Sequence, residues 1–187
     1  MVETDVRIAR MVQGWVSEVG SLASEFAAVF EAVQGFAPGE HAVLRASAEE
    51  GVASAGMLAR AGVPGSLVAL YSVLRSAELP DFGNGIWIDE AASLLEQAEA
   101  GNYPRLLAGA VDDRVTVFAT DGGGGMYAVS HAIGCVYHLT LGSLVGTTYD
   151  LDEDGYTVAA PNLGAFLEEL HYRLAQSVQA QWDIVRA

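Results

Sequence analysis

Lysine is absent from this sequence, and all nine basic residues are arginine. The absence excludes a Walker-type phosphate loop and a Schiff-base lysine, and nine scattered arginines do not make a polybasic nucleic-acid-binding face. Against them stand 24 acidic residues, which give the 187-residue chain a net charge of −15. We therefore expect cationic partners and no nucleic acid.

Cysteine is nearly absent as well. Cys135 is the only cysteine, which excludes an internal disulfide and a multi-cysteine metal site and is typical of a reducing compartment. The four histidines, His41, His131, His138 and His171, do not have the spacing of a metal-binding pair. We therefore predict no metal and no cofactor, and we expect Cys135 to be a small buried hydrophobe.

No segment has the character that a secretion signal or a membrane span requires. The first ten residues include two acids and two arginines, so they lack the apolar core of a signal peptide. Residues 122–149 carry no charged side chain over 28 positions, but seven glycines and two histidines within them favour short strands over a span. The sequence predicts a cytoplasmic protein that does not enter a membrane.

Hydrophobic periodicity predicts helices in the first part of the chain. From Ile8 to Val33 apolar residues recur every three or four positions, which is typical of one amphipathic helix, or of two separated at Gly20. Ser47 and Glu50 have the spacing of a capping box, which predicts a second helix over 47–61.

Further helices are predicted at three positions by their first residues. Pro64 suits the first turn of a third helix, and Asp89 with Glu90 suits the start of a fourth. The segment 78–85 between them is rich in turn-forming residues and is predicted to be a loop. Asn162 is a good N-cap for a last helix, whose apolar side extends to Val178.

Beyond Asp112 the period of the apolar residues changes from 3.6 to two, which is typical of strands. Three segments rich in β-branched or aromatic residues follow, at 115–120, 126–130 and 134–141. Short turn-forming segments separate them, so they predict an antiparallel meander. The three residues IWI at 86–88 predict one more short strand.

Five short motifs occur in a recognisable order along the chain. They are VPGSLVALY at 63–71, NGIWI at 84–88, VTVFATDGGGGMYAVS at 115–130, GCVYHL at 134–139 and LGAFLEEL at 163–170. In this order they resemble the SUKH superfamily, which includes fungal cell-wall synthesis regulators and bacterial immunity proteins that neutralise polymorphic toxins. The resemblance covers about residues 45–172.

The resemblance implies an α+β fold, with an antiparallel curved sheet packed against helices, and a protein-binding rather than a catalytic role. It does not extend to the first 40 residues. We therefore divide the chain into an N-terminal helical extension, residues 1–40, and a SUKH-like α+β domain, residues 41–187.

Two motifs invite a chemical interpretation that their context does not favour. Asp121 and the four glycines after it resemble a phosphate cradle, but they lack the GK[ST] ending and precede a strand, so we predict a turn. Asp150, Asp152 and Asp154 reproduce the opening of a calcium loop, but Pro161 stands where a bidentate Glu is needed. A solvated acidic loop is therefore expected there, with a weak cation site as the alternative.

No residues have the spacing of a catalytic constellation, since a nucleophile elbow and a facing acid pair are both missing. The sequence therefore predicts no catalytic residues and a non-enzymatic protein. An enzyme of unknown reaction stays open as an alternative hypothesis.

Acidic residues gather in the predicted meander, because residues 112–155 hold seven acids and one arginine. We predict that these acids and nearby aromatic side chains form a partner-binding face. The predicted residues are Asp112, Asp113, Asp121, Asp150, Asp152, Glu153, Asp154, Trp87, Tyr127, Tyr149 and Tyr156. The alternatives are that the acids serve only solubility and that the aromatic side chains pack in the core or the sheet.

The resulting hypothesis is an immunity protein that neutralises a bacterial toxin, such as a nuclease with a basic cleft, by covering it with an acidic face. The alternative is a regulator or scaffold like the cell-wall synthesis regulators, in which the N-terminal helix mediates partner docking or homo-oligomer formation.

Overall fold

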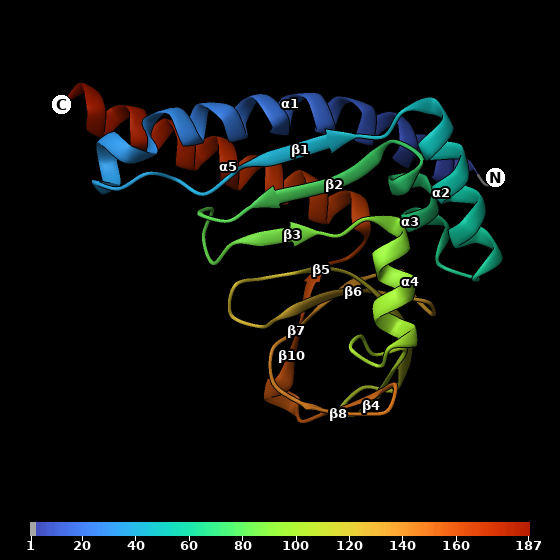
Figure 1. Ribbon diagram of the computed structural model, residues 1–187. Helices are drawn as coiled ribbons and strands as arrows, with labels where there is room; N and C mark the ends of the chain where they lie inside the picture. Colours follow the sequence, from blue (N-terminus) through green and yellow to red (C-terminus); the bar gives the residue numbers. More distant parts are fainter. Residues whose placement is uncertain (1–2) are drawn as a thin grey trace.

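The computed structural model describes residues 3–187 and confirms the predicted α+β class, so residues 1 and 2 of the predicted extension lie outside the described part. In chain order the elements are α1 (Glu3–Gln34), β1 (Ala42–Arg45), α2 (Ala48–Arg60), α3 (Gly65–Tyr71), β2 (Leu74–Leu79), β3 (Ile86–Ile88), α4 (Ala91–Glu99), β4 (Leu106–Gly109), β5 (Asp113–Thr120), β6 (Met126–Ser130), β7 (Val136–Leu139), β8 (Ser143–Val145), β9 (Thr148–Leu151), the 3-10 turn η1 (Glu153–Gly155), β10 (Tyr156–Ala160) and α5 (Leu163–Arg186). Figure 1 shows α1 and α5 side by side along one side of the sheet, with β4 and β8 at the opposite end of the molecule.

Helix α1 is a single unbroken helix that lies parallel to α5. Its Trp15 Nε1 donates a hydrogen bond to the carbonyl oxygen of Leu167 at 2.7 Å. One turn further on, Glu18 lies 3.7 Å from His171, so contacts along the two helices advance in the same direction. The helix ends at Gly35, whose φ of 81° is the left-handed conformation that commonly terminates helices.

The predicted starts of α2 and α5 are confirmed by side-chain caps, whereas α3 begins one residue after Pro64 and has no such cap. Ser47 Oγ accepts from the Glu50 amide at 3.2 Å, and Glu50 Oε2 accepts from the Ser47 amide at 2.8 Å, which completes the capping box. Pro64 is the N-cap of α3. The Asn162 side chain accepts from the Ala165 amide at 2.9 Å at the start of α5. These caps need only neighbouring residues, which is why the sequence predicts them.

The ten strands of residues 3–187 form one sheet in which every pairing is antiparallel except that of β4 with β9. The order along its main path is β1-β2-β3-β5-β4-β9-β8, and the predicted meander β5-β6-β7 branches from β5 and continues to β10. The predicted loop at 78–85 was wrong at its first two residues, because β2 extends to Leu79. Strand β2 is held by β1 on one side and β3 on the other, and this pairing is not visible in a local pattern.

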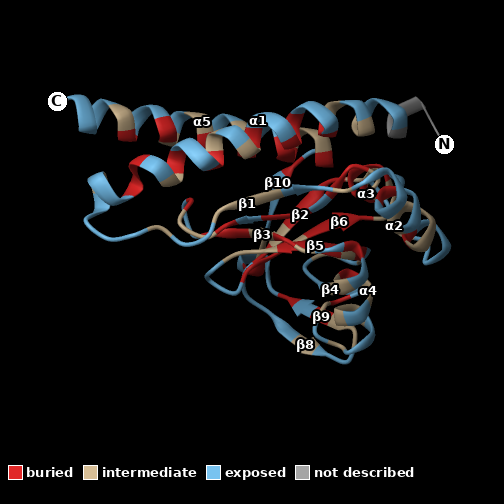
Figure 2. Ribbon diagram, turned by 45° about the horizontal axis from the view of Figure 1, so that its top comes forward, coloured by how far each residue is buried: buried red, intermediate tan, exposed pale blue. Residues whose placement is uncertain are grey.

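The two faces of the meander belong to two hydrophobic clusters. Phe118 and Val129 face the helices and join the larger cluster with α1, α3 and α5. Val117 and Ala128 face the other way and pack with Leu107 and other residues of β4, β7 and β9. Figure 2 shows the buried positions concentrated on the sheet and on the helix sides that face it.

Helix α1 contributes to the larger cluster rather than standing apart from it. Val12 and Val19 are fully buried, and Trp15, Phe26 and Phe30 are nearly so. Burial of several such side chains stabilises a domain by roughly 1.5–3 kcal/mol each. The apolar face of the predicted extension is therefore occupied within the chain, and the boundary at residue 40 stays a prediction.

Candidate functional site

An acidic groove of about 430 Å³ lies between α4 and the face of β2 and β3 that is turned away from α1 and α5. We call it the acidic groove, and its polar and aromatic lining consists of Ser76, Glu78, Trp87, Asp89, Glu90, Ser93 and Glu96. Four of these side chains are carboxylates, and none is basic. The groove therefore combines negative charge with one large aromatic ring.

The pairing of β2 with β3 places Glu78 beside Trp87. The two residues are direct partners in the antiparallel register, and their neighbours Ala77, Ile86 and Ile88 face the larger hydrophobic cluster. Because successive side chains of a strand alternate between faces, Glu78 and Trp87 share the opposite face.

Glycine at position 85 makes room for the Trp87 indole. A Cβ at Gly85 would lie 2.4 Å from Trp87 Cη2, and one at Gly122 would lie 3.7 Å from the same atom. The φ of Gly85 is 78°, which side chains other than glycine rarely adopt. The ring is thus seated against backbone and is half-buried.

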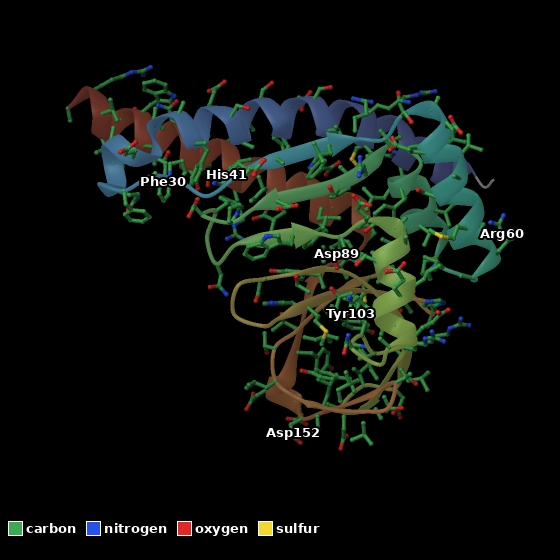
Figure 3. The ribbon with its side chains drawn as sticks, viewed as in Figure 1. Phe30, His41, Arg60, Asp89, Tyr103 and Asp152 are labelled. Atoms are coloured by element: carbon green, nitrogen blue, oxygen red, sulfur yellow. The ribbon has the colours of Figure 1, made fainter. Side chains whose placement is uncertain are left out.

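Asp89 is the half-buried carboxylate of the groove. Tyr103 donates its hydroxyl hydrogen to Asp89 Oδ2 at 2.5 Å. Burial raises the pKa of Asp89, and the hydrogen bond from Tyr103 opposes that rise. Figure 3 shows Asp89 and Tyr103 near each other beside α4.

The negative charge of the groove is neutralised at one end only. Arg75 Nε lies 2.9 Å from Glu90 Oε1, and Arg75 Nη1 lies 3.7 Å from Glu50. Within residues 3–187, Glu78 and Glu96 take part in no ion pair. These two exposed carboxylates are available to a cationic group from outside.

The carboxylate of the predicted site residue Asp121 forms hydrogen bonds within the same chain. Its carboxylate accepts from the amides of Gly123 and Gly125 at 2.8 Å each, and His138 Nε2 lies 2.8 Å from Asp121 Oδ2. Burial opposes ionisation, but these hydrogen bonds outweigh it and hold the pKa of Asp121 below its ordinary value. The glycine turn between β5 and β6 is confirmed, and its amides converge on this carboxylate.

The other predicted carboxylates lie elsewhere. Asp113 stands at the opposite end of β5 from Asp121, about 25 Å away at roughly 3.3 Å per residue. It accepts from Ser130 Oγ at 2.5 Å and from the Tyr137 hydroxyl at 3.2 Å, while its neighbour Asp112 is exposed.

A third group of predicted carboxylates is exposed on and beside η1, and it comprises Asp150, Asp152, Glu153 and Asp154. Figure 3 shows Asp152 at the end of the molecule farthest from α1 and well away from Asp89. The structure does not bring the seven predicted carboxylates together into one cluster.

Of the predicted aromatic residues, only Trp87 lines the acidic groove. Tyr149 is buried in the smaller hydrophobic cluster. Tyr127 stacks on His138 with ring centroids 4.4 Å apart, and Tyr156 packs edge-on against Tyr137 at 5.8 Å. For these three tyrosines the structure supports the packing alternative.

The sequence did not point to Glu78, Asp89, Glu90 or Glu96 as site residues. A signal existed for α4, because Ser93 and Glu96 lie one turn apart on its polar side. No local signal joins that helix face to β2, since their approach depends on the sheet pairing.

Neither a metal site nor a membrane span is evident in the part of the chain that the structure describes. No group of three or more His, Cys, Asp or Glu side chains in residues 3–187 could hold a metal ion. Across the same residues, none of the helices has the length and apolar character needed to traverse a bilayer.

The chain matches no protein-family model and none of the curated proteins. The resemblance to the SUKH superfamily therefore rests on the five ordered motifs alone. In the structure these motifs form α3, β3, the β5-β6 hairpin, β7 and the start of α5, which are elements around the larger cluster.

Proposed function

We propose that this protein binds a cationic partner protein through the acidic groove without catalysing a reaction. We further propose that it acts as an immunity protein that binds a secreted toxin and blocks its active surface. The observation that carries the proposal is that Glu78 and Glu96, which form no ion pair among residues 3–187, lie in one groove with the Trp87 ring that Gly85 makes room for. This replaces the meander as the proposed contact surface.

The groove has the components of a protein-binding hot spot. A ring already held in place loses little conformational freedom on binding, and an arginine from the partner gains by stacking on it. Glu78 and Glu96 then supply charge-assisted hydrogen bonds to the same guanidinium or to its neighbours.

The net charge of −15 serves the approach of the partner. A field of one sign raises association rates by about 10 to 1,000-fold at low salt. A toxin with a basic cleft, such as a nuclease, would be drawn to this surface, and occupation of the cleft would exclude its nucleic-acid substrate.

The alternative of a scaffold that associates through its N-terminal helix gains no support from the packing of α1. The apolar face of α1 is covered by α5 and the sheet of the same chain. Association through this helix would have to use its polar side.

The test first asks whether a neighbouring reading frame encodes a secreted protein with a toxin-like C-terminal domain, and then uses that domain as the binding partner. We expect Glu78→Gln with Glu96→Gln to weaken binding about tenfold or more, and Trp87→Ala to do the same. Calorimetry at about 50 and about 300 mM salt measures both the loss and the salt dependence, which the double variant should reduce.

The matched control is Asp152→Asn with Glu153→Gln, which removes the same charge from the exposed η1 turn. Equal weakening by both double variants would show that only net charge matters and would remove the groove from the proposal. Full protection of cells by the Trp87→Ala protein would do so as well.

A further inference from the structure

A second hollow lies on the other side of α4 and has the opposite charge character. It has a volume of about 270 Å³ and is walled by Leu94, Leu95 and Ala98 of α4 and by residues of β5 and of the turn between α2 and α3. We call it the arginine pocket, because Arg105 and Arg114 both line it. Glu99 is the one carboxylate among its lining residues.

The two arginines reach the pocket from adjacent strands. Leu106 of β4 is the register partner of Arg114 in β5, and Arg105 comes directly before Leu106. A Cβ at Gly62 would lie 3.9 Å from Arg114 Nη2, so the guanidinium lies over the turn between α2 and α3.

Neither arginine forms an ion pair with the described residues. In the part of the chain that the structure describes, no ion pair includes Arg105 or Arg114. This occurs although acids outnumber arginines by 24 to nine. Two exposed guanidinium groups without an ion pair, at a concave site with the single carboxylate of Glu99, are suited to a carboxylate or a phosphate.

Polar groups beside Arg114 are fixed in position. Thr116 lies two residues along β5, on the same face as Arg114, and its Oγ1 is 2.9 Å from His131 Nε2. Burial, together with the charge of Arg114, lowers the pKa of His131 against the influence of Asp113, so the ring is neutral at pH 7. The Thr116–His131 pair is therefore a neutral hydrogen-bonding surface of the pocket, and Glu99 remains its one carboxylate.

Apart from Glu99 and Tyr103, the rest of the wall is apolar, with Val63, Leu94 and Val117 among the lining residues. An engineered protein cavity of about 150 Å³ already takes up benzene. The larger volume of the arginine pocket accommodates a single-ring molecule that carries an anionic group.

We propose that the arginine pocket binds a small organic anion, a carboxylate or phosphate monoester on a compact apolar group, held by Arg105 and Arg114. The site shares no lining residue with the acidic groove, although Tyr103 of the pocket donates to Asp89 of the groove, and it does not depend on the proposed immunity function. Benzoate and phenyl phosphate serve as probes that distinguish the two anionic groups, and benzyl alcohol is the neutral analogue.

The experiment measures binding of each probe to the full chain by calorimetry and by amide chemical-shift changes. We expect saturable binding of one or both anions, with shifts at Gly62, Thr116 and His131. Benzyl alcohol should bind at least about tenfold more weakly, and Arg114→Gln should weaken anion binding by about tenfold or more.

Arg10→Gln is the matched control, because Arg10 is exposed on α1 and does not line the pocket. It should leave anion binding unchanged. Arg105→Gln provides the same test as Arg114→Gln if one of the two proteins does not fold. No saturable binding of either anion, equal binding of benzyl alcohol, or equal loss in the Arg10→Gln protein would each overturn the proposal.

Discussion

Gly85 and Trp87 show how the absence of one side chain determines the position of another. The indole occupies space that a Cβ at position 85 would need, and it thereby remains in the acidic groove. Glycine is required here for two separate reasons, the positive φ and the close approach.

Comparison of alanine at Gly85 with alanine at Gly124 separates these two reasons. We expect Gly85→Ala to lower the free energy of unfolding by about 2–4 kcal/mol, since left-handed strain and a clash with the indole add. Gly124→Ala is the control, because Gly124 has a φ of 84° with nothing within 4 Å of its Cβ position. Urea unfolding followed by tryptophan fluorescence measures both, and equal losses would contradict a role for the indole.

The carboxylate of Asp121 is hydrogen-bonded to groups of the same chain and is therefore not available to a partner. Its pKa is held below the ordinary value by the Gly123 and Gly125 amides and by His138. A depressed pKa means that the carboxylate stabilises the folded state above its unfolded pKa of about 4, and that this stabilisation is lost as the pH falls through the lower folded value.

We therefore expect Asp121→Asn to destabilise the protein by about 1–3 kcal/mol at neutral pH, with an effect that becomes smaller as the pH falls below the unfolded pKa of about 4. Urea unfolding across this pH range measures the difference from the natural protein. Asp152→Asn, in an exposed turn, should change stability little at any pH. A penalty for Asp121→Asn that stays constant down to about pH 2 would contradict the ionised carboxylate as its source.

At the scale of elements, α1 and α5 form a pair that neither could form alone. Leu170, Leu174 and Val178 of α5 belong to the same cluster as Val12, Val19 and other residues of α1. Removal of α1 would expose that row of α5 to water.

Deletion of residues 1–40 is therefore expected to abolish cooperative thermal unfolding of the remaining chain, or to make it aggregate. Circular dichroism and size-exclusion chromatography measure the two outcomes. Leu174→Ala is a milder probe of the same contact, with an expected loss of about 2–5 kcal/mol, and Gln176→Ala on the exposed side is its control. A stable, monomeric 41–187 fragment would establish residues 1–40 as a separate module.

The elements differ in how far a local pattern predicts them. The helices were predicted from period and caps, and the β5-β6-β7 meander from alternation and turn residues. Strand β2 was missed because its burial does not alternate along Leu74–Leu79, and its strand conformation depends on β1 and β3. The short strands β4, β8 and β9 likewise depend on distant partners.

At the scale of the whole molecule, an acidic hollow and an arginine-containing hollow lie on different sides of α4. The acidic groove lies on the side of Ser93 and Glu96, and the arginine pocket lies on the side of Leu94, Leu95 and Ala98. Two hollows of opposite character thus share one helix within a strongly acidic protein.

The excess of acid also predicts the behaviour of the molecule near its isoelectric point of about 4.4. We expect self-association to rise sharply as the pH approaches that value, because repulsion between copies disappears with the net charge. Light scattering between pH 7 and about pH 4.5 measures this, and the effect should reverse on return to pH 7. Scattering that does not change over this range would show that net charge does not keep the copies apart.

The sequence by itself determined the charge, the absence of lysine chemistry, the helices with their caps and the central meander, because each depends on composition or on residues a few positions apart. Only the tertiary structure decided which carboxylates face one another. Glu78, Asp89 and Glu96 line one groove because of strand pairing and helix packing, whereas Asp113 and Asp121, eight positions apart, are separated by the length of one strand. Proximity in space follows from the sheet register, which cannot be predicted by counting acids that are close together along the chain.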